Sequence, residues 1–219
     1  ISAHMMETAE ADIEYSDGTF RVAGTDRSLS LFEVAKAALD PANLPEGMEP
    51  GLDTEASHQP DAPTFPNGCH ICEMEIDPQT GIPEITRYTV VDDFGDTINP
   101  MLIAGQVHGG IVQGVGQALH EHTVYDSESG QLVSGSFIDY RMPRAADVPN
   151  FDFSMRNEKC TTNPLGIKGT GEAGAIGAPA ATISAIVDAL SDGGAICDVD
   201  MPATPDVIWA FANQQMAAE

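Results

Sequence analysis

The chain has 219 residues, 42% of them hydrophobic, which is enough for one or two compact domains with a hydrophobic core. Its 34 acidic and 9 basic residues give a formal net charge of −25. That charge argues against nucleic acid and anionic membranes as partners, because phosphate binding needs clustered cations. We expect no membrane insertion either, since no apolar run approaches the roughly 20 residues of a membrane helix.

The first 39 residues are predicted to form a helix–hairpin–helix segment. Asp17 and Gly18 form a turn signal between two short apolar runs, a pattern typical of a hairpin. Ser30 and Glu33 have the spacing of a capping box at the start of a helix. The predicted elements are a helix over residues 1–10, strands over 13–15 and 20–22, and a helix from 31 to 39.

Residues 40–66 contain six prolines and no helical or strand periodicity, so we predict a long surface connection there. The remaining residues, 67–219, are predicted to form the main domain. It begins with an alternating strand over residues 70–77, a turn, and a second strand over 85–91. In the first strand one face carries His70, Cys72, Met74 and Ile76, and the polar face carries Ile71, Glu73 and Glu75. Together the two strands predict a hairpin with one face in water.

The cysteines do not predict a metal site. They are Cys69, Cys72, Cys160 and Cys197. The first two form a CxxC pair, but the others stand alone, and His70 does not complete a zinc ligand set. In the predicted strand Cys69 and Cys72 point to opposite faces. We therefore expect ordinary thiols in a reducing cytoplasm.

A helix with five glycines is predicted from Pro100 to Leu119, with Asn99 as its N-cap. Each glycine costs roughly 1 kcal/mol against alanine in a helix interior. The apolar stripe is Ile103, Val107, Ile111, Val115 and Leu119, and the opposite side carries Gln106, Gly109, Gly110, Gln113 and Gln117. This uncharged face either contacts a polar, partly buried ligand or packs closely against another backbone.

Beyond this helix, strands are predicted over residues 123–125 and 132–138. Pro179 is predicted to open a last helix, because apolar residues follow it at helical spacing. Hairpins interleaved with helices indicate an α+β fold.

Residues 163–174 form a glycine-rich loop around one glutamate, Glu172. Gly169, Gly171 and Gly174 match G-x-G-x-x-G, but the apolar strand that a dinucleotide-binding fold needs does not precede them. A carboxylate fixed in a crowded loop beside Lys168 is a candidate general base. The alternative, a solvated loop glutamate, leaves the surrounding glycines unexplained.

Several motifs, in order along the chain, resemble the large subunit of the molybdenum hydroxylases. They are VDDFG at 91–95, INP at 98–100, GQVHGGIVQGVGQAL at 105–119, DYRMP at 139–143 and GIKGTGEAG at 166–174. TFPNG at 64–68 looks most like the carbon monoxide dehydrogenase-like branch of the xanthine dehydrogenase and aldehyde oxidase family. On these motifs the chain is identified as the C-terminal part of such a subunit.

The resemblance implies an α+β molybdenum cofactor-binding domain in which hairpins and a mixed sheet pack against helices. It implies a molybdopterin cytosine dinucleotide carrying molybdenum, and hydroxylation with water as oxygen donor. Electrons then leave through 2Fe-2S clusters on a small subunit and FAD on a medium subunit, in a dimer of heterotrimers. By position, Glu172 is implied as the glutamate beside the metal.

The implied cofactor contacts lie in the glycine-rich helix, in the glycine-rich loop and around the preceding strand. In the helix and loop they are Gln106, Gly109, Gly110, Gln113, Gly114, Gln117, Lys168, Gly169 and Gly171, and near the nucleotide end they are Asp92, Asp93, Thr97 and Asn99.

The family's large subunit is several times longer than this chain. Its upstream half carries a further glycine-rich loop and the substrate-selecting loop. This chain is therefore expected to hold part of an active site and to be inactive alone. The substrate stays open among carbon monoxide, an aldehyde and a heterocycle. The alternative is a truncated, non-catalytic module that folds and binds partner subunits.

Overall fold

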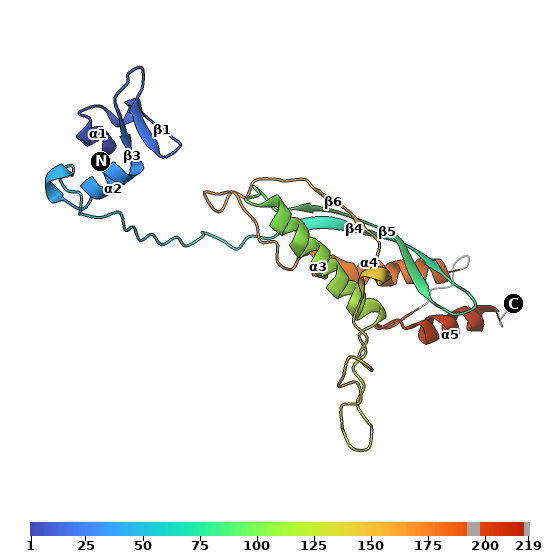
Figure 1. Ribbon diagram of the computed structural model, residues 1–219. Helices are drawn as coiled ribbons and strands as arrows, with labels where there is room; N and C mark the ends of the chain where they lie inside the picture. The colour runs from blue at the N-terminus through green and yellow to red at the C-terminus, as the bar shows by residue number, and fades with distance from the viewer. Residues whose placement is uncertain (192–197, 217–219) are drawn as a thin grey trace. The chain divides into compact units, whose positions relative to one another are not determined.

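The computed structural model describes residues 1–191 and 198–216, so Cys197 lies outside the described residues. The chain divides into two compact units, Ile1–Gln59 and Pro60–Glu219, and the boundary falls inside the proline-rich segment (Figure 1). Each unit combines helices with a three-stranded sheet, which confirms the predicted α+β class.

The first unit is an antiparallel sheet with short helices. Its elements are α1 (Ser2–Met5), the 3-10 helix η1 (Glu10–Asp12), β1 (Ile13–Ser16), β2 (Thr19–Val22), β3 (Ser28–Ser30), α2 (Leu31–Ala37) and the 3-10 helix η2 (Pro41–Asn43). The capping box of α2 is confirmed, since Ser30 Oγ accepts from the Glu33 N–H at 3.2 Å and Glu33 accepts from the Ser30 N–H at 2.8 Å. The helix predicted over residues 1–10 is wrong beyond α1, because Glu7 adopts a left-handed backbone with φ of 49°.

The second unit is built on a mixed sheet in the order β4-β5-β6. β4 (Asn67–Ile76) and β5 (Pro83–Asp93) form the predicted antiparallel hairpin, and β6 (Phe151–Met155), which was not predicted, runs parallel to β5. The alternation along β4 is confirmed, with His70, Cys72, Met74 and Ile76 partly buried and the residues between them exposed. Cys69 is exposed, so the two cysteines of the CxxC pair lie on opposite faces as predicted.

The helices of the second unit are α3 (Pro100–Leu119), α4 (Ala173–Leu190) and α5 (Pro205–Met216), with a 3-10 helix η3 at Ala145–Asp147. α3 has its predicted bounds and its predicted cap, since Asn99 Oδ1 accepts from the Leu102 N–H at 3.2 Å. α5 was not predicted. The strands predicted over 123–125 and 132–138 are reduced to one bridge between Tyr125 and Leu132.

Pro179 does not open α4, which begins six residues earlier at Ala173. A proline inside a helix removes one backbone hydrogen bond and needs room for its ring. Gly114 of α3 supplies that room, because a Cβ added there would lie 2.8 Å from the Pro179 ring. The early start of α4 therefore depends on a tertiary contact that the local sequence does not show.

α3 and α4 run parallel and pack through glycines. A Cβ on Gly110 would lie 2.7 Å from the backbone of α4, and one on Gly174 would overlap the Val107 carbonyl oxygen. Further along both helices, a Cβ on Gly114 would lie 2.6 Å from the Ala178 Cβ. The predicted apolar stripe is confirmed as core, with Ile103, Val107, Ile111, Val115 and Leu119 each at most 8% exposed. Close backbone packing thus accounts for part of the glycine content.

Replacing Gly110 by leucine is expected to destabilise the metal-free protein by about 1–3 kcal/mol, because the new side chain must displace the backbone of α4. Gly109→Ala is the matched control. No described atom lies within 4 Å of a Cβ added there, so helix propensity predicts a gain of up to about 1 kcal/mol. Thermal unfolding of both variants checks this, and equal melting temperatures for Gly110→Leu and wild type would contradict the packing.

α4 is one helix that is long and apolar enough to cross a membrane by length and composition, which the sequence analysis did not anticipate. Ala178, Thr182 and Ile186 on this helix are fully buried. Ala178 and Ile186 belong to the hydrophobic core of the second unit, and 28% of the helix is buried there.

Candidate functional site

The exposed side of α3 carries the uncharged residues that the sequence singled out. Gln106, Gly109, Gln113 and Gln117 are all exposed. Gly110 and Gly114, in contrast, are buried against α4. The two interpretations of this helix therefore apply to different residues: the glycines at the helix contact serve packing, and the glutamine side is open to a ligand.

The glycine-rich loop is tied to the end of β5 by backbone hydrogen bonds. The Lys168 N–H donates to the Phe94 oxygen at 2.8 Å, and the Asp96 N–H donates to the Gly166 oxygen at 2.8 Å. Gly166 has φ of +69°, a conformation that favours glycine. Asn163 closes the loop by donating to the Ile167 oxygen at 2.9 Å. The loop therefore has a fixed course beside the residues that follow β5.

A buried ion pair joins the same two segments. The Lys168 ammonium contacts the Asp93 carboxylate, and their side chains are 14% and 8% exposed. Asp93 also accepts from the backbone N–H groups of Gly95 at 2.9 Å and Glu158 at 3.0 Å. Burial raises the pKa of Asp93, but the ammonium and the two N–H donors outweigh it and lower the pKa from 3.8 to about 2. Asp93 is therefore ionised and fixed in place.

Glu172 is the N-cap residue of α4, and its side chain is exposed. Its carbonyl oxygen accepts from the Ala175 and Ile176 N–H groups at 3.0 Å each. Gly174 packs on the backbone of α3 at Val107 and Gly110, and Gln106 and Gln113 lie one helical turn to either side of Gly110. The start of α4 therefore lies near these two exposed glutamines.

The crowded loop expected around Glu172 is not found in the described part of the chain. No described atom lies within 4 Å of a Cβ added at Gly169 or Gly171, and both glycines are exposed. Before Glu172, Lys168 is fixed by its ion pair with Asp93. After Glu172, the first turns of α4 are fixed by packing on α3.

The remaining predicted residues lie around the ends of these elements. Asn99 uses its side-chain oxygen to cap α3, and Thr97 is partly buried. Asp92, next to Asp93, is 3% exposed and faces a different set of side chains. The structure thus brings together the loop, Asp93 and Lys168, and places Glu172 beside the glutamine side of α3.

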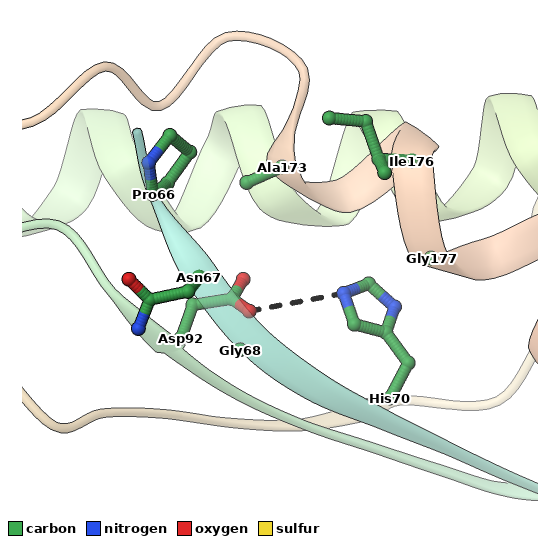
Figure 2. Close-up of a pocket in the computed structure, with 8 residues that line it drawn as sticks. All are labelled: Pro66, Asn67, Gly68, His70, Asp92, Ala173, Ile176 and Gly177. Carbon is green, nitrogen blue, oxygen red and sulfur yellow. Dashed lines mark ion pairs between the residues drawn. The ribbon is translucent and has the colours of Figure 1, made fainter. Parts of the chain in front are cut away.

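Sequence analysis missed a buried polar cluster beneath α4. Figure 2 shows His70 and Asp92 beside Ala173, Ile176 and Gly177 of this helix, around a pocket that Pro66, Asn67 and Gly68 also line. His70 Nε2 lies 3.8 Å from Asp92 Oδ1, and His70 Nδ1 lies 2.9 Å from the Tyr88 hydroxyl. The inward position of His70 was predicted, but its partners depend on the register of β4 and β5.

Comparison with known proteins gives the family. The sequence pattern of the family described as molybdopterin cofactor-binding domain matches residues 1–149. This chain belongs to that family. The chain is 40% identical to the 6-hydroxypseudooxynicotine dehydrogenase complex subunit gamma of Paenarthrobacter nicotinovorans, over 100% of this chain and 27% of that protein.

Other relatives of the chain are oxidoreductases. It is 32% identical to the carbon monoxide dehydrogenase large chain of Hydrogenophaga pseudoflava, over 100% of this chain and 27% of that protein. The solved structure of quinoline 2-oxidoreductase from Pseudomonas putida 86 matches with a TM-score of 0.84 and 36% identity, over 97% of this chain and 27% of that one. The chain thus spans about a quarter of the length of these relatives, and its fold is that of their molybdenum cofactor-binding domains.

Proposed function

We propose that this chain is the C-terminal portion of the molybdopterin-binding catalytic subunit of an oxidoreductase. That enzyme hydroxylates or oxidises carbon monoxide, an aldehyde or a heterocycle, with water as the oxygen donor. The observation that carries the proposal is the placement of exposed Glu172 at the start of α4, beside the exposed, uncharged glutamine side of α3. The family of the chain supplies the cofactor class.

The exposed residues suit a molybdopterin cytosine dinucleotide with molybdenum. Amide groups both donate and accept hydrogen bonds, as the edge of a pterin requires, so Gln106, Gln113 and Gln117 would hold the cofactor. At Gly109 the open backbone permits close approach. The start of α4 adds N–H groups that lack partners within the helix, which favours the phosphate groups of a dinucleotide.

Glu172 acts as the general base of the reaction. The bound cofactor supplies the oxidation of the substrate and the oxygen from water. The Glu172 carboxylate takes the proton that this oxygen loses, or orients the substrate by a hydrogen bond. The ion pair of Lys168 with Asp93 and the hydrogen bond from the Lys168 N–H to the Phe94 oxygen fix the loop four residues before Glu172.

Electrons leave to partner subunits in this proposal. Among the residues that the structure describes, no group of three or more His, Cys, Asp or Glu side chains converges on a point that a metal could occupy. We therefore expect an iron–sulfur small subunit with 2Fe-2S clusters and a medium subunit with FAD, in a dimer of heterotrimers within the cytoplasm.

Purification of the complete subunit from its native host tests this arrangement. The expected result is copurification of iron and flavin with molybdenum in one active complex, resolved by size-exclusion chromatography and elemental analysis. A fully active preparation without iron or flavin would refute the electron route.

The alternative function is a non-catalytic module that folds and binds partner subunits. It is favoured by one observation, that the loop before Glu172 is open, since no described atom lies within 4 Å of a Cβ added at Gly169 or Gly171. A parent protein that lacks the upstream cofactor loop would support this alternative over catalysis.

A further inference from the structure

Three inward-facing side chains of the β4–β5 hairpin form a cluster, here called the His70 cluster: His70, Tyr88 and Asp92. In the strand register His70 pairs with Val90, so Tyr88 and Asp92 are its two diagonal neighbours on the same face. Their polar atoms meet there, with the Tyr88 hydroxyl 2.9 Å from Nδ1 and Asp92 Oδ1 3.8 Å from Nε2 of the ring.

The cluster is buried against the first turns of α4. The side chains of His70 and Asp92 are 7% and 3% exposed, and Tyr88 is fully buried. Two glycines leave the necessary space. A Cβ on Gly177 of α4 would lie 2.8 Å from the His70 ring, and a Cβ on Gly68 would overlap the Asp92 carboxylate. Figure 2 shows the ring and the carboxylate below the helix, joined by the dashed line.

The C-terminal end of β5 contacts the chain before Glu172 directly and the chain after Glu172 through His70. Neighbouring strand residues point to opposite faces, so Asp92 faces His70 under α4 while Asp93 holds Lys168. Lys168 lies four residues before Glu172 and Gly177 lies five residues after it. The segment that carries Glu172 is thus held at one end by Asp93 and at the other by the His70 ring.

We propose that His70, Tyr88 and Asp92 are positioning residues that fix the start of α4 and with it the direction of the Glu172 carboxylate. This inference rests on the catalytic role of Glu172 proposed above. In this proposal Asp92 acts through Gly177 and the helix and not as the cofactor contact that the resemblance implies, since its side chain is only 3% exposed.

Hydrogen bonding gives the His70 ring one orientation. When the Tyr88 hydroxyl donates to Nδ1, the proton of the neutral ring is on Nε2 and points toward the Asp92 carboxylate. Among the described residues, Asp92 Oδ2 has no hydrogen-bond partner. Apolar residues of the same size in place of Tyr88 and Asp92 would fill the space but would leave the His70 ring free to turn. A fixed start of α4 therefore needs the polar contacts of these two side chains.

The charge of Asp92 distinguishes a positioning role from a stabilising role, because the ionised, buried carboxylate disfavours the folded state. Burial raises the pKa of Asp92 from 3.8 to about 6 and lowers the pKa of His70. Because the pKa of Asp92 is higher in the folded state, its ionised form disfavours folding above pH 6, and this penalty disappears as the pH falls below 3.8. His70 and Tyr88 are the titratable groups of the hairpin that face Asp92 under α4, and α4 contributes uncharged Ala173, Ile176 and Gly177. On its other side Asp92 lines a second pocket with the charged residues Asp93, Arg156 and Glu158.

The test uses Asp92→Asn and Tyr88→Phe in the complete enzyme. Each change keeps the shape and removes a charge or a hydroxyl. We expect kcat to fall about tenfold to a hundredfold through misplacement of the base, with unchanged KM and molybdenum content. The melting temperature of Asp92→Asn at pH 7.5 should equal or exceed that of wild type. Asp152→Asn, on the exposed outer face of the sheet beside Arg87, is the matched control and should keep wild-type turnover.

A double-mutant cycle with Glu172→Gln decides whether the effect passes through Glu172. Asp92→Asn should reduce turnover little further once Glu172 is glutamine. An equal loss in both backgrounds, or a loss matched by reduced molybdenum and melting temperature, would overturn the positioning role while leaving Glu172 catalytic. Wild-type turnover of the Glu172→Gln single variant would instead overturn the proposed function itself.

Discussion

Replacing Glu172 by glutamine is expected to lower the turnover of the complete enzyme by at least about two orders of magnitude, the usual contribution of a positioned base. Glutamine keeps the size of the side chain and its capacity for hydrogen bonds, but it removes basicity. The exposed position at the start of α4 means that no described packing contact depends on the carboxylate. Steady-state kinetics on the purified complex would measure the loss.

Glu128→Gln is the control for this change. Glu128 is also exposed and lies in the turn between Tyr125 and Leu132. Its replacement should leave turnover and molybdenum content at wild-type values. A Glu172→Gln enzyme that loses its molybdenum would make Glu172 a residue of the cofactor site and would contradict its role as the base.

Removal of the Asp93 carboxylate should strongly destabilise the second unit. Asp93→Ala leaves the buried Lys168 ammonium and the N–H groups of Gly95 and Glu158 without their acceptor. Breaking a buried ion pair in this way costs about 3–5 kcal/mol. Chemical denaturation of the metal-free protein would measure the cost, and a loss below 1 kcal/mol (about the value of an exposed pair) would contradict the anchoring of the loop.

Asp96→Ala is the matched control, since Asp96 pairs with Lys159 at 3.5 Å with both side chains more than half exposed. That pair should contribute no more than about 1 kcal/mol.

The pH dependence of the free energy of unfolding gives a second check. The folded pKa of Asp93, about 2, is below its ordinary value of 3.8, so its stabilisation is present above pH 3.8 and is lost as the pH falls through 2. Asp93→Ala should lack this acid-dependent loss.

The sequence predicted correctly those helices and strands that are defined by residues close together in the chain. The Asn99 cap and the apolar stripe define α3 without reference to the rest of the chain, and the hairpin of β4 and β5 follows from alternation and a turn. Elements that depend on distant partners were missed. β6 pairs in parallel with β5 some 60 residues away, and α4 continues through Pro179 because Gly114 leaves room for the ring.

In the candidate site, too, some features were visible in the local sequence and others depend on residues far apart in the chain. The glutamine side of α3 and the loop around Glu172 were visible as unusual composition, and the resemblance to the molybdenum hydroxylases gave them roles. The pairing of Asp93 with Lys168 joins residues 75 positions apart, and local sequence carries no sign of it. His70 was placed on the inward face correctly, but the strand register was needed to bring Tyr88 and Asp92 to it.

Turnover per bound molybdenum in the Glu172→Gln enzyme is the most direct measurement of the central claim, that this chain contributes the catalytic base beside the cofactor. Kinetics and elemental analysis on the same preparation give the ratio. We predict turnover per molybdenum at least about two orders of magnitude below wild type, at a molybdenum content near that of wild type. Wild-type turnover per molybdenum would contradict the account and leave Glu172 a structural residue.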